Sequence, residues 1–412
     1  MTTPLTTSIP APASPLPVRD SLPQRITLLC LAALTVMAGA TVVPSLPALQ
    51  DHFADSNHSE LLSKMVLTLP ALSIALGAPL AGVAADRWGR LPLLLGALLL
   101  YALAGTSGLI ADSLPALLAG RALLGLAAAG TMTAVTALAG DYYRGTQRKN
   151  FMGSKAAFVS FGGVVFLLIG GLLADWHWRA PFAVYALALL LLPAVLRNLR
   201  ELPRFTDTAA ATAEQAPAHN RPLLAAVLGA ALLASLAFFL IPTQMPFLLR
   251  ELGITQPSRA GLAIGCGNLA AAVSALLLYR RLRLRNSGLV AASFAVMGTG
   301  LLLVTSAEGY GVLILALVLF GLGKGVLMPH LAARALELAP AALRGRVAGA
   351  LTASLFLGQF LSPLASQPLV AHFGLTAGFA VMGTVLLLVA AATAAAICWP
   401  DYKMNAYSVM MK

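Results

Sequence analysis

The string Gly82-Val83-Ala84-Ala85-Asp86-Arg87-Trp88-Gly89-Arg90 is a short charged segment between two long apolar runs. The run before it covers about residues 61–84, and the run after it covers about residues 91–111. Each run is close to the roughly 20 apolar residues that a helix needs to cross the hydrocarbon core of a bilayer. The string is therefore predicted to be a tight hairpin between two transmembrane helices.

The same alternation of apolar runs and polar breaks continues along the chain. Of its 412 residues, 59% are hydrophobic and 10% are charged, whereas soluble domains contain about 25% charged residues. We predict an all-α membrane protein of about twelve transmembrane helices. The predicted spans are 25–48, 61–84, 91–111, 115–139, 150–173, 180–198, 222–248, 259–279, 287–306, 311–335, 345–370 and 375–399.

The spans fall into two groups of six, which predicts two six-helix pseudo-repeats. The N-terminal bundle is predicted over 25–199 and the C-terminal bundle over 222–399, with a polar cytoplasmic linker at 200–221. Residues 1–24 are rich in Pro, Thr, Ser and Ala and are predicted to form a disordered cytoplasmic tail. Residues 400–412 are predicted to form a second cytoplasmic tail.

Two weak echoes link the halves. The string Val43-Pro44-Ser45-Leu46-Pro47 ends the first span, and Ile241-Pro242-Thr243-Gln244-Met245-Pro246 ends the seventh. Because proline removes a helical hydrogen bond, each half is predicted to open with a helix weakened near its outer end. Similarly, Arg144-Gly145 precedes the fifth span and Arg344-Gly345 precedes the eleventh.

The basic residues predict the orientation. Most of the 27 Lys and Arg residues fall on the side that carries both termini, and short cytoplasmic loops are enriched in such residues. We therefore expect a multi-pass protein of the bacterial inner membrane with both termini cytoplasmic. No nucleic-acid partner is expected, because the basic residues lie in short runs between spans rather than on one polar face. Four basic residues fall on the outer side: Lys64, Arg179, Arg250 and Arg259.

The pattern G-x-x-x-D-R-x-G-R at residues 82–90 resembles the loop signature of the major facilitator superfamily. The resemblance implies a two-bundle transporter fold in which this hairpin gates the conformational change. It implies that Asp86 lies near the positive N-terminal end of the eleventh span, and that the arginines bind neighbouring carboxylates or lipid phosphates. Alternatively, the two arginines have no such binding role and only follow the positive-inside rule. The predicted gating residues are Gly82, Asp86, Arg87, Gly89, Arg90 and Arg344.

A second string, Arg121-Ala-Leu-Leu-Gly125, resembles the Arg-x-x-x-Gly element of proton-coupled efflux members of that family. Those members carry a Gly-Pro-x-x-Gly-Gly element in the fifth span, whereas this chain has Phe166-Leu-Leu-Ile-Gly-Gly171. The two glycines are retained and the Gly-Pro pair is not. The antiporter subclass therefore does not follow from this element.

Charged residues within spans are costly, so those that occur usually face a cavity. All acidic residues fall in tails, loops or the outermost turns of spans, and the remaining buried charges are basic. Lys324 lies near the middle of the tenth span among Gly321, Gly323 and Gly325, and we predict that it binds substrate. Lys155 lies about one turn inside the fifth span. It is predicted to bind substrate as well, with snorkelling of its side chain to the membrane surface as an equal alternative.

Other polar residues within spans complete the predicted site. Arg121 keeps its charge, so it is predicted to bind a substrate anion or to tune proton exchange, with helix packing as the alternative. His330 is a candidate for proton coupling, because an unperturbed histidine side chain changes its charge near neutral pH. Gln244, Asn268 and Gln359 are predicted to line a cavity, with bonds between helices as the alternative.

The sequence favours a secondary active transporter that exports a small organic molecule, coupled to protons. A basic cavity without acids favours anionic or zwitterionic cargo, such as a metabolite or a siderophore-like compound. A broad-specificity drug efflux antiporter and an importer of organic anions remain alternatives. An intramembrane hydrolase lacks its motifs, so we expect no enzyme, cofactor or metal site. A monomer in the bilayer, with a small molecule and protons as partners, is expected.

The predicted topology can be tested by labelling. In intact cells, a Thr212→Cys variant should stay unreactive toward an impermeant thiol reagent, because residue 212 lies in the predicted cytoplasmic linker. The same reagent should react after the cells are permeabilised. Reaction in intact cells would reverse the assigned orientation.

Overall fold

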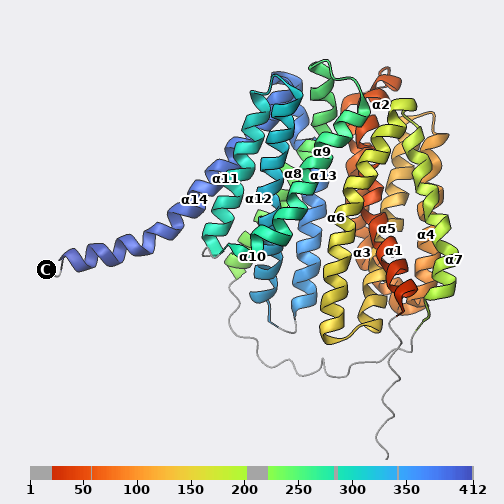
Figure 1. Cartoon of the computed structure of the whole chain (residues 1–412), viewed down its shortest axis with the longest axis horizontal. Helices are drawn as coiled ribbons and strands as arrows, with labels where there is room; N and C mark the ends of the chain where they lie inside the picture. Colours follow the sequence, from red (N-terminus) through yellow and green to blue (C-terminus); the bar gives the residue numbers. More distant parts are fainter. Residues whose placement is uncertain (1–20, 57, 202–220, 283–285, 341–342, 411–412) are drawn as a thin grey trace, which may run out of the picture.

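The computed structural model describes residues 21–56, 58–201, 221–282, 286–340 and 343–410, and the structural statements below concern these residues. Within them, 12 helices are long and apolar enough to cross a membrane (Figure 1). This confirms the predicted all-α membrane fold. Most of the predicted tail 1–24 and linker 200–221, and the basic residues Arg283 and Arg285, lie outside the described residues.

The helices follow one another with short connections. Those of the N-terminal half are α1 (Leu22–Ala40), η1 (Val43–Ser45), α2 (Leu46–His52), α3 (Ser59–Trp88), α4 (Arg90–Thr106), η2 (Ser107–Leu109), α5 (Leu114–Tyr142), α6 (Gly145–Trp176), η3 (Ala180–Ala186) and α7 (Leu187–Asn198). Those of the C-terminal half are α8 (Arg221–Glu251), α9 (Pro257–Val273), η5 (Ser274–Leu278), α10 (Tyr279–Arg281), α11 (Asn286–Thr305), α12 (Tyr310–Glu337), α13 (Arg344–Phe373) and α14 (Leu375–Met410).

Each half has its own hydrophobic core. One core is built from buried residues between Leu28 and Leu199, and the other is built mainly from residues between Val227 and Ala390. Figure 1 shows the two bundles side by side, with α6 next to the C-terminal bundle. Four N-terminal residues, Val43, Leu46, Leu67 and Leu167, belong to the second core. The bundles are thus joined by apolar contacts as well as by the chain.

Several element boundaries differ from the predicted ones. The first helix begins at Leu22, inside the predicted tail, because the side chain of Ser21 caps it by accepting a hydrogen bond from the amide of Gln24. The charged hairpin is shorter than predicted, because α3 continues to Trp88 and only Gly89 separates it from α4. The last helix, α14, continues to Met410, through most of the predicted second tail, and its end projects away from the bundle (Figure 1).

The two proline strings behave differently. In the first half, the helix changes to a 3-10 turn at Val43–Ser45 and resumes at Leu46. In the second half, α8 runs unbroken from Arg221 to Glu251 through both Pro242 and Pro246. The seventh span therefore stays one helix, although each of its two prolines lacks the amide hydrogen that a helical hydrogen bond needs, and the weakening of this helix stays a prediction.

The bundles touch at one end of the molecule. We define the linker end as the end of the molecule that holds Trp88–Arg90, Tyr142–Gly145 and the ends of α7 and α8 next to the linker. The opposite end is called the far end. At the far end, a Cβ atom on Gly261 of α9 would lie 2.5 Å from the carbonyl oxygen of Leu167 on α6. At the linker end, a Cβ on Gly82 or Gly349 would meet nothing within 4 Å.

Glycines also set the packing of α12. A Cβ on Gly321 would collide with the carbonyl oxygen of Gly267, and one on Gly325 with that of Ala271, both on α9. A Cβ on Gly323 would lie 2.6 Å from the carbonyl oxygen of Ser293 on α11. The glycines around Lys324 therefore admit neighbouring backbones, and they fix the position of α12 against two helices.

Gly321→Ala should destabilise the protein by about 1–3 kcal/mol, because the added methyl group forces α12 away from α9. The matched control is Gly229→Ala in α8, where a Cβ meets nothing within 4 Å; this change should be neutral or slightly stabilising. The measurement is the midpoint of thermal unfolding of the purified variants in one detergent. Equal midpoints for both variants would show that the close contact between α9 and α12 is unimportant.

Candidate functional site

A cavity of about 250 Å³ lies between the two bundles. Its walls come from α1, η1, α3 and α6 of the first half and from α8, α9 and α13 of the second. Three polar side chains, Thr35, Asn268 and Gln359, line it, and the other lining residues are apolar or glycine. A largely apolar pocket with a few polar groups, placed where two bundles meet, suits a small organic ligand.

Lys324 lies next to this cavity. It lines a smaller pocket that shares Phe238, Ile264 and Asn268 with the central cavity. Its Nζ atom lies 2.9 Å from the centroid of the Phe238 ring. Lys324 makes no hydrogen bond or ion pair among the described residues. Its ammonium is stabilised there by a cation–π contact with the face of this ring. An ammonium group in this state can accept an anionic ligand without first breaking an ion pair.

The three predicted amides occupy two kinds of position. Asn268 and Gln359 line the central cavity, Asn268 from α9 and Gln359 from α13. Gln244 is fully buried, and its Nε2 donates to the Oγ of Ser366 on α13 at 3.1 Å. The Oε1 of Gln244 has no partner among the described atoms. Gln244 thus joins α8 to α13, the alternative that sequence reasoning left open.

Arg121 lies inside the N-terminal bundle, 1% exposed. Its guanidinium donates to the carbonyl oxygens of Val66 at 2.8 Å and Ala38 at 2.7 Å, and to the hydroxyl of Tyr185 at 2.9 Å. These bonds tie α5 to α3, α1 and η3. Ala38 itself lines the central cavity. Arg121 therefore supports the cavity wall from behind and does not line the cavity.

The other two predicted residues lie away from the central cavity. His330 of α12 is buried, and its ring centroid lies 6.3 Å from that of Tyr279. Lys155 of α6 donates from Nζ to the Oγ1 of Thr136 on α5 at 2.9 Å. The structure thus places Asn268 and Gln359 in the walls of the cavity and Lys324 in an adjoining pocket, and it leaves Arg121, Gln244, His330 and Lys155 outside both.

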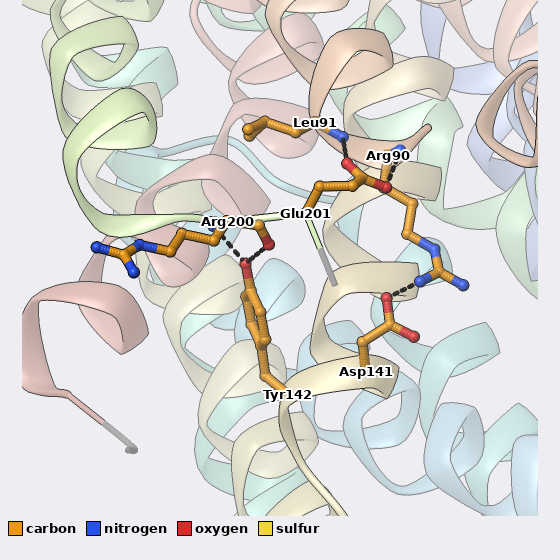
Figure 2. A network of polar contacts seen from close by, with 6 residues as sticks. All are labelled: Arg90, Leu91, Asp141, Tyr142, Arg200 and Glu201. Carbon is orange, nitrogen blue, oxygen red and sulfur yellow. Dashed lines mark hydrogen bonds and ion pairs between the residues drawn. The ribbon is translucent and has the colours of Figure 1, made fainter. Parts of the chain in front are cut away.

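The hairpin at the linker end is held by a polar network (Figure 2). The guanidinium of Arg90 forms an ion pair with Asp141 at the end of α5. The hydroxyl of the adjacent Tyr142 donates to the carbonyl oxygen of Arg200 at 2.5 Å and accepts from the amide of Arg200 at 2.8 Å. The network therefore fastens the start of the linker to two helices of the N-terminal bundle.

Glu201 completes the network by capping α4. Its carboxylate accepts from the amide of Arg90 at 2.8 Å and from that of Leu91 at 2.6 Å. A carboxylate at this place satisfies free amide groups and the positive end of the helix dipole. Gly89 adopts a φ of 103°, and a Cβ there would lie 3.3 Å from the Glu201 carboxylate. Glycine is thus required both by the backbone and by the cap.

The remaining hairpin residues are solvent-accessible. Asp86 and Arg87 are exposed, and they make no hydrogen bond or ion pair within the part of the chain that the structure describes. A Cβ on Gly82 would meet nothing within 4 Å, so no neighbouring helix approaches this residue closely in this conformation. Arg344 is exposed at the start of α13. The expected pairing of Asp86 with the start of the eleventh span is therefore absent from this conformation.

Polar contacts between the bundles lie at the far end. Lys64 is 2% exposed, and its Nζ donates to the Oε1 of Gln367 at 2.6 Å. The Nε2 of Gln367 donates to the Oε2 of Glu60, also at 2.6 Å. An ion pair of 2.5 Å joins Arg250 to Asp51. Among described residues, every hydrogen bond or ion pair between the bundles belongs to this end, so the far end is closed.

Sequence reasoning missed Lys64, Gln367, Asp141 and Glu201 as candidate functional residues. Lys64 was predicted to face the outer side, and its partner Gln367 is about 300 residues away along the chain. Only a weak signal in the sequence pointed to Glu201. It is an acidic residue that follows the sixth predicted span, on the same side of the membrane as the basic hairpin. No three His, Cys, Asp or Glu side chains within the described residues are grouped as metal ligands.

The comparisons with known proteins agree with the fold. The family model described as Major Facilitator Superfamily matches residues 28–363 and 227–406. The chain is similar to the Bacillibactin exporter of Bacillus subtilis, 27% identical over 164 residues, which are 38% of this chain and 40% of that protein. It is 34% identical over 136 residues to Multidrug resistance protein 1 of Bacillus subtilis, covering 32% of this chain and 35% of that protein. The matched part thus spans less than half the length of either relative.

Two solved structures share the arrangement of helices. The human organic anion transporter MFSD10 (TETRAN) has a TM-score of 0.66 at 19% identity, covering 91% of this chain and 100% of that chain. A bacterial homolog to the human lysosomal transporter Spinster, in an inward-facing and occupied conformation, has a TM-score of 0.68 at 19% identity, covering 90% of this chain and 95% of that chain. At this identity the likeness shows the fold.

The cap on α4 can be tested by Glu201→Gln. An amide presents one acceptor oxygen and no charge, so the variant should lose about 0.5–2 kcal/mol of stability. The matched control is Glu337→Gln, whose carboxylate forms an exposed pair with Arg334 and caps no helix start; it should have little effect. Thermal unfolding of both purified variants measures the difference. If the two variants unfold at the same temperature, Glu201 does not stabilise the hairpin.

Proposed function

The chain belongs to the major facilitator superfamily, and on this premise we propose that it is a secondary active transporter that exports a small organic anion or zwitterion. In this proposal the two bundles rock around the central cavity and open it to one side of the bacterial inner membrane at a time. The linker end faces the cytoplasm. No step of the cycle needs a cofactor.

The observation that carries the proposal is the position of Lys324. Its ammonium lies beside an apolar cavity between the bundles and has no acidic partner among the described residues. A charge within the membrane is costly unless it serves a function. Asn268 and Gln359 offer hydrogen bonds to the rest of a ligand. An anionic group on the cargo supplies the counter-charge that the protein lacks there.

The closed far end supports the assignment of the conformation. Lys64, Glu60 and Gln367 join the bundles there, while glycines at the linker end face open space. If the linker end is cytoplasmic, this is an inward-facing state, ready to take cargo from the cell. In the opposite state the far-end contacts separate, and Asp86 and the start of α13 come together.

The names of two relatives support export, and two residues of this chain support proton coupling. Both relatives from Bacillus subtilis have names that fit export, the Bacillibactin exporter and Multidrug resistance protein 1. For the coupling ion we propose protons, with Arg121 fixing the helices that frame the cavity and His330 as the group that binds the proton. His330 lies on the same helix as Lys324, so protonation there would act on the helix that presents the binding cation.

A drug efflux pump of broad specificity is the second candidate. The apolar walls of the cavity, including Phe238, Phe239 and Phe356, favour it. Such a pump would gain affinity from apolar area alone, because the hydrophobic effect needs no fixed geometry. The two candidates differ in their dependence on Lys324.

Substitutions at Lys324 separate the two candidates. The cargo is first identified as the compound retained by cells that lack the protein, with and without a proton uncoupler. Lys324→Gln should then weaken binding of this cargo by about 1–3 kcal/mol, roughly fivefold to a hundredfold, because an ion pair in a partly dry cavity is lost. Lys324→Arg should retain part of the affinity, and Lys324→Glu should repel an anion.

Lys155→Gln is the matched control, because Lys155 bonds to Thr136 away from the cavity. Its cargo affinity should stay near that of the parent. Equilibrium binding to purified protein and transport in everted vesicles give the two readouts. A Lys324→Glu variant that transports the native cargo as well as the parent would show that cargo binding does not depend on the cation.

A further inference from the structure

Phe238 contacts the Lys324 ammonium and also lines the central cavity. Its ring lines both the cavity and the smaller pocket of Lys324, and the ring centroid lies 2.9 Å from Nζ. The face of the ring is electron-rich, so it stabilises the cation where water and other acceptors are absent. The ring therefore covers one side of the ammonium at a place where the two pockets share a lining residue.

The helix that carries Lys324 is held in place. Gly321 and Gly325, on either side of Lys324, are in close contact with the backbone of α9. This contact leaves α12 little freedom to shift. Phe238 is half-buried and packs edge-on against Phe239, with ring centroids 5.0 Å apart. Uncovering the ammonium by a movement of the Phe238 ring therefore does not require α12 to shift.

The helix that carries Phe238 is weakened at that residue. The carbonyl oxygen of residue 238 would accept a hydrogen bond from the amide of residue 242, four positions later. Residue 242 is Pro242, which has no amide hydrogen and lies inside the unbroken helix α8. The backbone at Phe238 therefore lacks one of the bonds that hold an α-helix straight. A small local adjustment of the backbone at Phe238 therefore breaks no hydrogen bond from this carbonyl group.

We propose that Phe238 is a lid on Lys324, occupying the place of an anionic group in the empty protein and swinging into the cavity when cargo binds. This inference rests on the proposed function and narrows its cargo. Displacing the ring loses a favourable contact, so a ligand must replace it with both an ion pair and apolar contact. The cavity therefore selects small monoanions with an apolar, preferably aromatic, body, and it rejects small hydrophilic anions.

The lid is tested by the chemical accessibility of Lys324, which needs no cargo. Purified protein is treated with acetic anhydride, and acetylation of Lys324 is followed by peptide mass spectrometry. Phe238→Ala should raise the rate by about tenfold, because the amine loses its cover. Phe238→Leu retains an apolar side chain and serves if the alanine variant does not fold. Phe356→Ala is the matched control and should leave the rate unchanged, since its ring lines the cavity from α13 and makes no ring contact with Phe238 or Lys324 among the described residues.

Selectivity is tested with two probes, 1-naphthoate and formate. In the wild type, 1-naphthoate should slow acetylation of Lys324, and formate should not. In the Phe238 variants both anions should slow it. Equal rates of acetylation in the wild type and in the Phe238 variants would overturn the lid.

Failure of the wider proposal gives a different pattern. If acetylation rises in the Phe238 variants but neither anion slows it in any protein, the lid is correct and anion binding at Lys324 is wrong. Protection by formate in the wild type as strong as that by 1-naphthoate would show that the ring does not select cargo.

Discussion

The position of one ammonium group, Lys324, constrains the rest of the structure. A charge inside a membrane bundle needs an acid, several backbone acceptors or a ligand, and among the described residues the structure offers it an aromatic ring. The glycines beside it seat α12 against α9 and α11, so the lysine cannot escape to the surface by a shift of its helix. The Phe238 ring also forms part of the wall of the cavity between the bundles, and the other walls of this cavity are mostly apolar.

Arg121 shows the contrasting solution in the other bundle. It is 1% exposed, yet two carbonyl oxygens and a tyrosine hydroxyl bind its guanidinium. The glycine of the Arg-x-x-x-Gly element, Gly125, has a structural role as well. A Cβ at Gly125 would lie 2.5 Å from the carbonyl oxygen of Pro70 on α3. The N-terminal bundle therefore uses Arg121 for cohesion. In the C-terminal bundle, Lys324 has the Phe238 ring as its neighbour beside the shared cavity.

The architecture followed from the sequence because the bilayer imposes a length and a composition on every span, and both are local properties. The polar site followed in part: depth within a span identified Lys324, Asn268 and Gln359, which the structure places at the cavity. Depth could not separate these from Gln244, Arg121 and Lys155, since the side of a helix that faces a cavity depends on how helices pack. The contacts of Lys64 with Gln367 and of Glu201 with α4 join distant parts of the chain, and no local pattern contains them.

The central claim is that the cavity recognises a negative charge on an apolar ligand. It is tested most directly by the binding of 1-naphthoate and of 1-naphthamide, its uncharged analogue of nearly equal shape, to the purified wild-type protein at one salt concentration. The account predicts that the acid binds more tightly than the amide by about tenfold or more, as an ion pair in a partly dry cavity requires. If the amide binds as tightly as the acid, shape and apolar area decide recognition, and the account is contradicted.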